Sequence, residues 1–136
     1  MTRPFRPALI ITFLALLTGC ISGPPLQTTV ITSPSKRLEI YWVRTYQDKK
    51  GVLVMGTVRR PALAKGTIWG HLHIVGMFDD RRPPITVDAR WGSLSSRGSR
   101  SAPFSAVLPT SDPLAIKSVR IEYRAERDRA RTPHLD

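Results

Sequence analysis

LEIYWVRTYQDKKGVLVMGTV, residues 38–58, is the stretch of sequence that decides the fold. Side chains of alternating character begin at Leu38, and a period of two is the pattern of a β-strand. The alternation predicts a strand that runs to about Tyr46, with Leu38, Ile40 and Trp42 on one face.

A hairpin turn follows this strand. Residues 47–51, QDKKG, are polar and end in Gly51, a residue that turns often require at a left-handed position. The return strand, residues 52–58, is rich in β-branched side chains, and its Gly56 predicts a bulge or a close backbone approach. We therefore expect two adjacent antiparallel strands near the start of the domain.

The alternation recurs along the rest of the chain. The longest run, residues 66–78, predicts a strand whose core face carries Ile68, Leu72, Ile74 and Phe78. Shorter runs predict strands at residues 85–89, 104–108 and 119–123. By contrast, GSLSSRGSRS at residues 92–101 is so polar that we expect it to stay outside the core.

Length and composition limit the number of domains and the kinds of site. The chain has 136 residues, enough for one core but too few for two independent ones. Its single cysteine excludes an intramolecular disulfide and every multi-cysteine metal cluster. No cofactor is expected.

Residues 1–19 have the three parts of an export signal. Arg3 and Arg6 precede an apolar run from Ala8 to Leu17, which falls short of the about 20 residues that a bilayer requires. Small or polar residues follow the run. We expect this segment to be a signal peptide that is cleaved.

LTGC, residues 17–20, resembles the lipobox of bacterial lipoproteins. The resemblance implies that Cys20 becomes a lipidated N-terminus that holds the protein on a membrane; the alternative is a buried cysteine at the end of a membrane anchor. Ile21 stands where an aspartate would imply inner-membrane retention, which favours the outer membrane with the domain facing the periplasm. Residues 20–29, with two prolines, are expected to form a tether.

The strands together predict an all-β domain over residues 30–124, folded as a small sandwich of about six or seven strands, with a small barrel as the alternative. Their number and spacing resemble immunoglobulin-like and fibronectin-type-III-like modules of envelope lipoproteins. This resemblance implies a core tryptophan, a role that suits Trp42, although a tryptophan beneath a loop would give the same pattern. Residues 125–136 are dominated by charge and predict a frayed tail.

His71 and His73 have metal-ligand spacing. Two histidines separated by one residue on a strand point to the same side, and Met77 belongs to the same face. Imidazole and thioether ligands suit copper, and imidazole also suits zinc. The alternative is that these side chains decorate an outer sheet face.

The basic surplus suggests a different partner. Cleavage after Gly19 would remove Arg3 and Arg6 and lower the formal charge from +11 to +9. An exported protein meets anionic envelope polymers first, and nucleic acid is not expected. The candidate polyanion-binding residues in expected turns and loops are Arg59, Arg60, Arg81, Arg82, Arg97 and Arg100.

These observations favour a non-enzymatic accessory of the cell envelope. No serine lies in a nucleophile elbow, and Asp79-Asp80 precedes Arg81-Arg82 in a turn that neutralises itself. We expect a lipid-anchored interaction or structural module that binds other envelope proteins. The alternatives are a copper- or zinc-binding protein and a polyanion-binding module.

Overall fold

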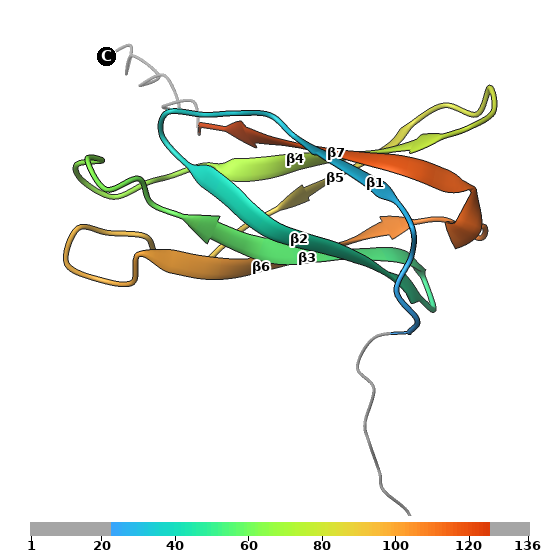
Figure 1. Ribbon diagram of the computed structural model, residues 1–136, viewed down its shortest axis with the longest axis horizontal. Helices are drawn as coiled ribbons and strands as arrows, with labels where there is room; N and C mark the ends of the chain where they lie inside the picture. Colours follow the sequence, from blue (N-terminus) through green and yellow to red (C-terminus); the bar gives the residue numbers. More distant parts are fainter. Residues whose placement is uncertain (1–22, 126–136) are drawn as a thin grey trace, which may run out of the picture.

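The structure is a computed structural model that describes residues 23–125, and this part of the chain is a β-sandwich. A four-stranded sheet with the order β1-β7-β4-β5 faces a three-stranded sheet with the order β2-β3-β6. The elements, shown in Figure 1, are β1 (Thr29–Thr32), β2 (Glu39–Asp48), β3 (Gly51–Arg59), β4 (His71–Phe78), β5 (Ile85–Ala89), β6 (Ser101–Pro109), the short 3-10 helix η1 (Pro113–Ala115) and β7 (Ile116–Arg124). The predicted fold class is confirmed.

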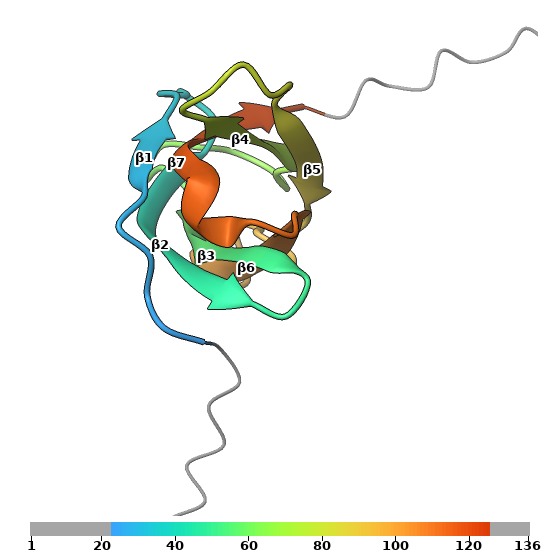
Figure 2. The same ribbon diagram turned by 90° about the vertical axis from the view of Figure 1, so that its right-hand side faces the viewer.

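The core lies between the two sheets, and a view along the strands shows them enclosing it (Figure 2). Alternate residues of each strand point inward, as the period of two predicted. Every core residue, and every partly buried apolar residue packed on the core, lies between Leu26 and Tyr123. A chain that begins at residue 23 therefore keeps every core residue of the described part. The fully buried side chains are Leu38, Val52, Val54, Val58, Leu72, Ile74, Leu94, Leu108, Val119 and Ile121.

Trp42 is not the core tryptophan that the resemblance to immunoglobulin-like modules implied. The register of β2 against β3 shifts between Tyr41 and Val43, which is a β-bulge, and Trp42 has a φ of 54°. Because the bulge inserts one residue, Tyr41 and Trp42 both point outward, 41% and 51% exposed, before Val43 returns to the core side. A positive φ is rare for a bulky residue, so the surrounding sheet holds Trp42 in a strained conformation.

Gly56 makes room for this bulge. A Cβ at Gly56 would lie 2.6 Å from the carbonyl oxygen of Trp42 and 2.9 Å from the ring of Phe104. No side chain fits there without movement of backbone or ring. The prediction of a bulge or a close backbone approach at this glycine is confirmed.

The loop after β5 contributes to the core, contrary to the prediction. Leu94 is fully buried, and its carbonyl accepts a hydrogen bond of 3.1 Å from the N–H of Ile68. The strand expected over residues 66–78 is shorter than predicted. It begins at His71, so residues 66–70 lie outside β4. The two loops pack on each other, and a single leucine is enough to fix a polar segment against the core.

The proline-rich segment expected as a tether lies along the sandwich instead. The N–H of Gly23 donates to the carbonyl of Gln47 at 3.0 Å, and Leu26 donates to Thr45 at 2.9 Å. β1 then pairs in parallel with β7. Residues 23–32 thus follow the edge of β2 and then that of β7. Any tether is confined to positions before 23.

Some predictions concern residues outside the described part. They are the signal peptide, the lipidation of Cys20 and nearly all of the expected tail, because residues 1–22 and 126–136 are not described. Within residues 23–125, no helix has the length and apolar character needed to cross a membrane.

Candidate functional site

Three loops converge at one end of the sandwich, which we call the basic end; they are residues 33–38, 60–70 and 90–100. They gather at the left of Figure 1. The N–H of Arg60 donates to the carbonyl of Arg100 at 2.8 Å, which joins the second loop to the third. Glu39 pairs with Arg59 where β2 begins and β3 ends, which brings the first loop beside the second.

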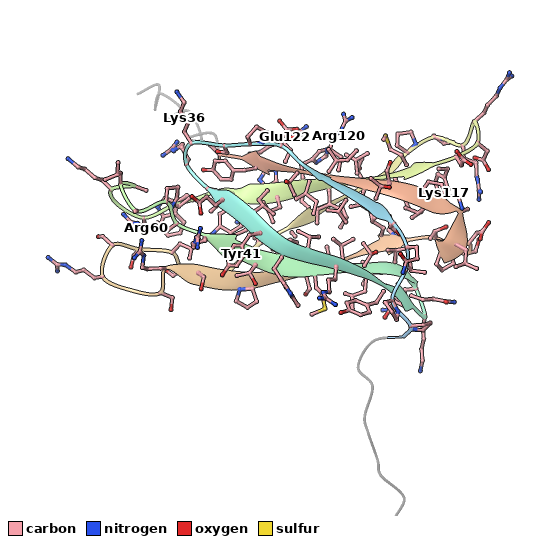
Figure 3. The ribbon with its side chains drawn as sticks, viewed as in Figure 1. Lys36, Tyr41, Arg60, Lys117, Arg120 and Glu122 are labelled. Atoms are coloured by element: carbon pink, nitrogen blue, oxygen red, sulfur yellow. The ribbon has the colours of Figure 1, made fainter. Side chains whose placement is uncertain are left out.

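The three loops of the basic end carry cations and no acid. Its loops contain no Asp or Glu, and their exposed cations are Lys36, Arg37, Lys65, Arg90, Arg97 and Arg100. Apart from Arg90, none of these side chains has an ion pair within residues 23–125. Unpaired cations on adjacent loops produce a positive potential that attracts anions. Figure 3 shows Lys36 projecting from this end.

Arg60 is the exception among the predicted surface arginines. Its side chain is only 5% exposed, and its Nη2 donates to the carbonyl of Ala64 within the same loop. Its Nη1 is buried without a hydrogen-bond partner in the described part of the chain. Arg60 therefore does not present its guanidinium at the surface as expected, but its buried charge adds to the positive potential of the basic end (Figure 3).

A shallow open pocket of about 150 Å³ lies at the same end, between the loops that flank β4 and β5. Trp69 and Trp91 face this pocket together with Arg90. The Trp69 side chain is 67% exposed, whereas Trp91 packs on the core and stacks at a tilt on Tyr123, with ring centroids 6.0 Å apart. The remaining lining residues are Thr67, Ile68, Gly70, Gly92 and Ser93.

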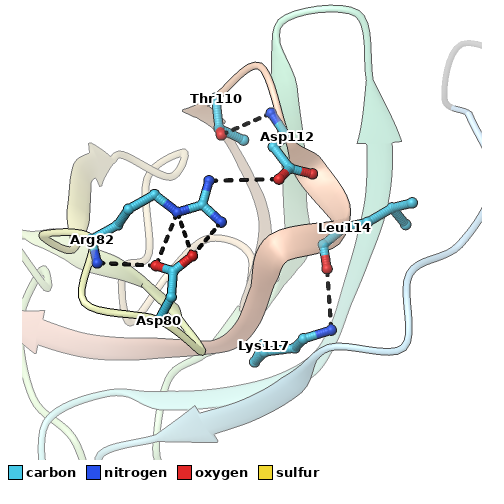
Figure 4. Close-up of polar contacts among 6 residues, drawn as sticks. All are labelled: Asp80, Arg82, Thr110, Asp112, Leu114 and Lys117. Atoms are coloured by element: carbon cyan, nitrogen blue, oxygen red, sulfur yellow. Dashed lines mark hydrogen bonds and ion pairs between the residues drawn. The ribbon is translucent and has the colours of Figure 1, made fainter.

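The opposite end, formed by residues 48–51, 79–84 and 110–115, has mixed charge, and we call it the mixed-charge end. Arg82 donates to both carboxylate oxygens of Asp80, at 2.9 and 2.8 Å, and lies 3.5 Å from Asp112 (Figure 4). The hydrogen bond from Arg82 lowers the pKa of Asp80 below its ordinary value of 3.8. The Arg82 guanidinium also lies 4.3 Å from the Phe78 ring centroid. Arg82 is therefore already paired, and its neighbour Arg81, though exposed, lies far from the basic end.

Arg59 is also paired within the fold. Its guanidinium lies 2.7 Å from the Glu39 carboxylate and 5.1 Å from the Tyr41 ring centroid. Of the predicted polyanion-binding residues, only Arg97 and Arg100 are exposed, unpaired in the described part, and on acid-free loops.

His71 and His73 lie on the outer face of the four-stranded sheet beside Asp88. Nδ1 of His73 is 2.9 Å from the Asp88 carboxylate, and Nε2 of His71 is 3.8 Å from it. Because a carboxylate only accepts, Nδ1 of His73 carries the proton in this contact. The hydrogen bond to His73 lowers the pKa of Asp88 below 3.8, and the nearby His71 and Arg124 charges act in the same direction.

Met77 does not join these histidines. It follows His73 by four residues on β4, and a strand rises about 3.3 Å per residue, so the two lie about 13 Å apart. Residues 23–125 contain no group of three or more His, Cys, Asp or Glu side chains arranged to hold a metal ion. The sequence thus identified a real histidine pair, but the structure gives it a carboxylate partner in place of the thioether.

The chain matches no protein-family model, no curated protein and no solved structure. The site is therefore interpreted from its own residues.

Several members of the basic end were not predicted as site residues. They are Lys36, Arg37, Lys65, Trp69, Arg90 and Trp91. The sequence shows that residues 60–70 and 90–100 contain no Asp or Glu. The convergence of three separate loops was not, because it depends on how the sheets pair.

Proposed function

We propose that the chain is an exported, lipid-anchored protein of the cell envelope that acts by binding rather than by catalysis. The export signal and the lipobox resemblance at Cys20 support the anchor, with the outer membrane and the periplasm as the location. The titratable groups that lie together, His71, His73 and Asp88, stand on an exposed sheet face rather than in a pocket, which favours binding over catalysis.

The segregation of charge between the two ends carries this proposal. The chain joins the sandwich at Gly23, which is hydrogen-bonded to Gln47 beside the mixed-charge end. Only two residues separate Gly23 from Cys20, so an acylated Cys20 would lie within about 10 Å of that end. β2 has 10 residues and spans about 33 Å, which separates the basic end from the anchor. In this arrangement the mixed-charge end faces the bilayer, and the basic end points away from it.

The anchor is tested by replacing its acceptor. Cys20→Ser is expected to abolish incorporation of labelled palmitate and to move the protein from the membrane fraction to the soluble fraction. Wild-type protein that stays in the membrane without label would refute the lipid anchor.

The orientation has its own test, with the lipidated protein in vesicles that carry a headgroup quencher. A fluorophore on Lys49→Cys, at the mixed-charge end, is expected to be quenched. The matched fluorophore on Lys65→Cys, at the basic end, is expected to stay bright. Equal quenching of the two positions would contradict the proposed orientation.

A second candidate function, binding of anionic polymers, is favoured by the unpaired cations of the basic end. Binding to long-chain polyphosphate is expected to weaken steeply as salt rises, because the exposed charges are screened. Arg97→Glu with Arg100→Glu should lower the affinity strongly. Lys49→Glu with Lys50→Glu makes the same change in charge at the other end and should have little effect. Equal losses in both variants would show that only net charge matters.

A further inference from the structure

We infer that the basic end holds an anionic glycan, with a sugar ring on the indole surface of Trp69 and Trp91 and the acidic groups of the chain on the loop cations. The inference deepens the proposed binding of anionic polymers by naming the chemical class of the polymer. It rests on the proposed function for the choice of the basic end and for the export of the chain, and it does not depend on the lipid anchor.

One residue, Tyr123, contacts both tryptophans. The hydroxyl of Tyr123 donates to the backbone carbonyl of Trp69 at 2.7 Å, and its ring packs against Trp91. Gly70, with a φ of 143°, lets the chain pass close to Tyr123, since a Cβ there would lie 2.8 Å from the Tyr123 ring. Tyr123 therefore fixes the backbone at Trp69 and supports the Trp91 ring, which lowers the entropy lost when a ligand binds.

The exposed indole of Trp69 favours a ligand that has a flat apolar face. A tryptophan has one of the largest apolar surfaces of any side chain, yet Trp69 is 67% exposed at the rim of an open pocket. The C–H bonds on one face of a pyranose carry partial positive charge and fit the negative face of an indole. The ring hydroxyls would then meet polar groups of the lining, among them Arg90 and Ser93.

The surrounding charge favours an acidic glycan over a neutral one. Lys65, Arg97 and Arg100 are exposed on the loops beside the pocket, and no carboxylate of those loops competes for them. Arginine pairs with carboxylate and phosphate groups through two parallel hydrogen bonds. Buried Arg60 adds a charge that water screens poorly. An acidic peptide would satisfy these cations but lacks the flat apolar face that suits Trp69.

Single-stranded nucleic acid also combines stacking with negative charge. The export signal in residues 1–19 favours the glycan, because it directs the chain to a compartment where the abundant polyanions are envelope polymers. The binding test described next distinguishes an anionic glycan from a single-stranded nucleic acid.

The test uses the chain without residues 1–22, which retains every core residue found within residues 23–125. Affinity for polygalacturonate, whose charges are carboxylates, and for a phosphomannan, whose charges are phosphates, is measured by calorimetry. At least one of them is expected to bind more tightly than polyphosphate, and the preferred one identifies the acidic group. Trp69→Ala should weaken that binding by about tenfold, the usual loss when a stacking aromatic is removed. It should leave polyphosphate binding nearly unchanged.

Trp42→Ala is the matched control, because Trp42 is also an exposed tryptophan but lies on the outer face of the three-stranded sheet. It should bind the glycan as the wild type does, and a thermal melt of each variant confirms that it is folded. If Trp69→Ala and Trp42→Ala weaken binding equally, or if neither glycan binds, the inference is overturned. Tighter binding to a single-stranded oligonucleotide than to either glycan also overturns it. Retained polyphosphate binding in any of these cases would leave the broader polyanion proposal intact.

Discussion

Leu94→Ala tests whether the loops of the basic end are anchored to the core. Leu94 is fully buried although polar residues surround it in the sequence. Truncation of a fully buried leucine removes apolar contacts and leaves a cavity, which together cost about 3 kcal/mol. In a domain of this size such a loss lowers the Tm by about 10–20 °C. A drop of this size would show that the loop of residues 90–100 contributes as much to stability as a core strand.

The control is Leu63→Ala, which makes the same chemical change in the neighbouring loop. Leu63 is 94% exposed, so its truncation should change the free energy of unfolding by less than about 0.5 kcal/mol. Urea unfolding followed by circular dichroism measures both variants, and the slope against urea should stay the same if only stability changes. Similar midpoints for the two variants would mean that Leu94 is not packed as described.

Other substitutions test the bulge and the histidine cluster. Gly56→Ala should lower the free energy of unfolding by about 1–3 kcal/mol, because the new Cβ meets the Trp42 carbonyl and the Phe104 ring; an unchanged urea midpoint would argue against that close packing. Trp42→Gly should be more stable than Trp42→Ala by about 1 kcal/mol, the reverse of the usual order in a strand, because only glycine adopts a positive φ without strain; the usual order in thermal melts would show that the bulge relaxes. The folded-state pKa of Asp88 is lowered, so the stability of wild type over Asp88→Asn should be full above pH 3.8 and disappear as the pH falls through the lowered pKa; a difference that persists at pH 2 would contradict this origin.

Alternation of side chains predicted the strands well where both sheet faces are regular. Val119, Ile121 and Tyr123 lie on the inner face of β7, and Ile74 lies on that of β4. The same method misplaced Trp42, because a bulge inserts one residue and reverses the alternation beyond it. Gly56 was the only sign of this bulge in the sequence, and it marked the partner strand rather than the bulged one.

The candidate site was less predictable than the fold. The sequence showed that arginines occupy loops, but not that Arg59 has Glu39 as a partner or that Arg60 is buried. Those outcomes depend on register and on loop packing, which are set by contacts between residues distant in sequence. Leu94 illustrates the same limit, because one apolar residue has no periodicity.

Residues 23–32, which follow the edges of both sheets, cover part of the open edge of β2 and of β7. An uncovered edge of β2 or β7 would present a row of free N–H and C=O groups, a template for pairing with another chain. Proteolysis after position 32 would create two such edges at once. If the segment docked on a neighbouring molecule instead, the product would be a strand-exchanged dimer. Both sheet edges are therefore covered only once this N-terminal arm has closed on its own sandwich.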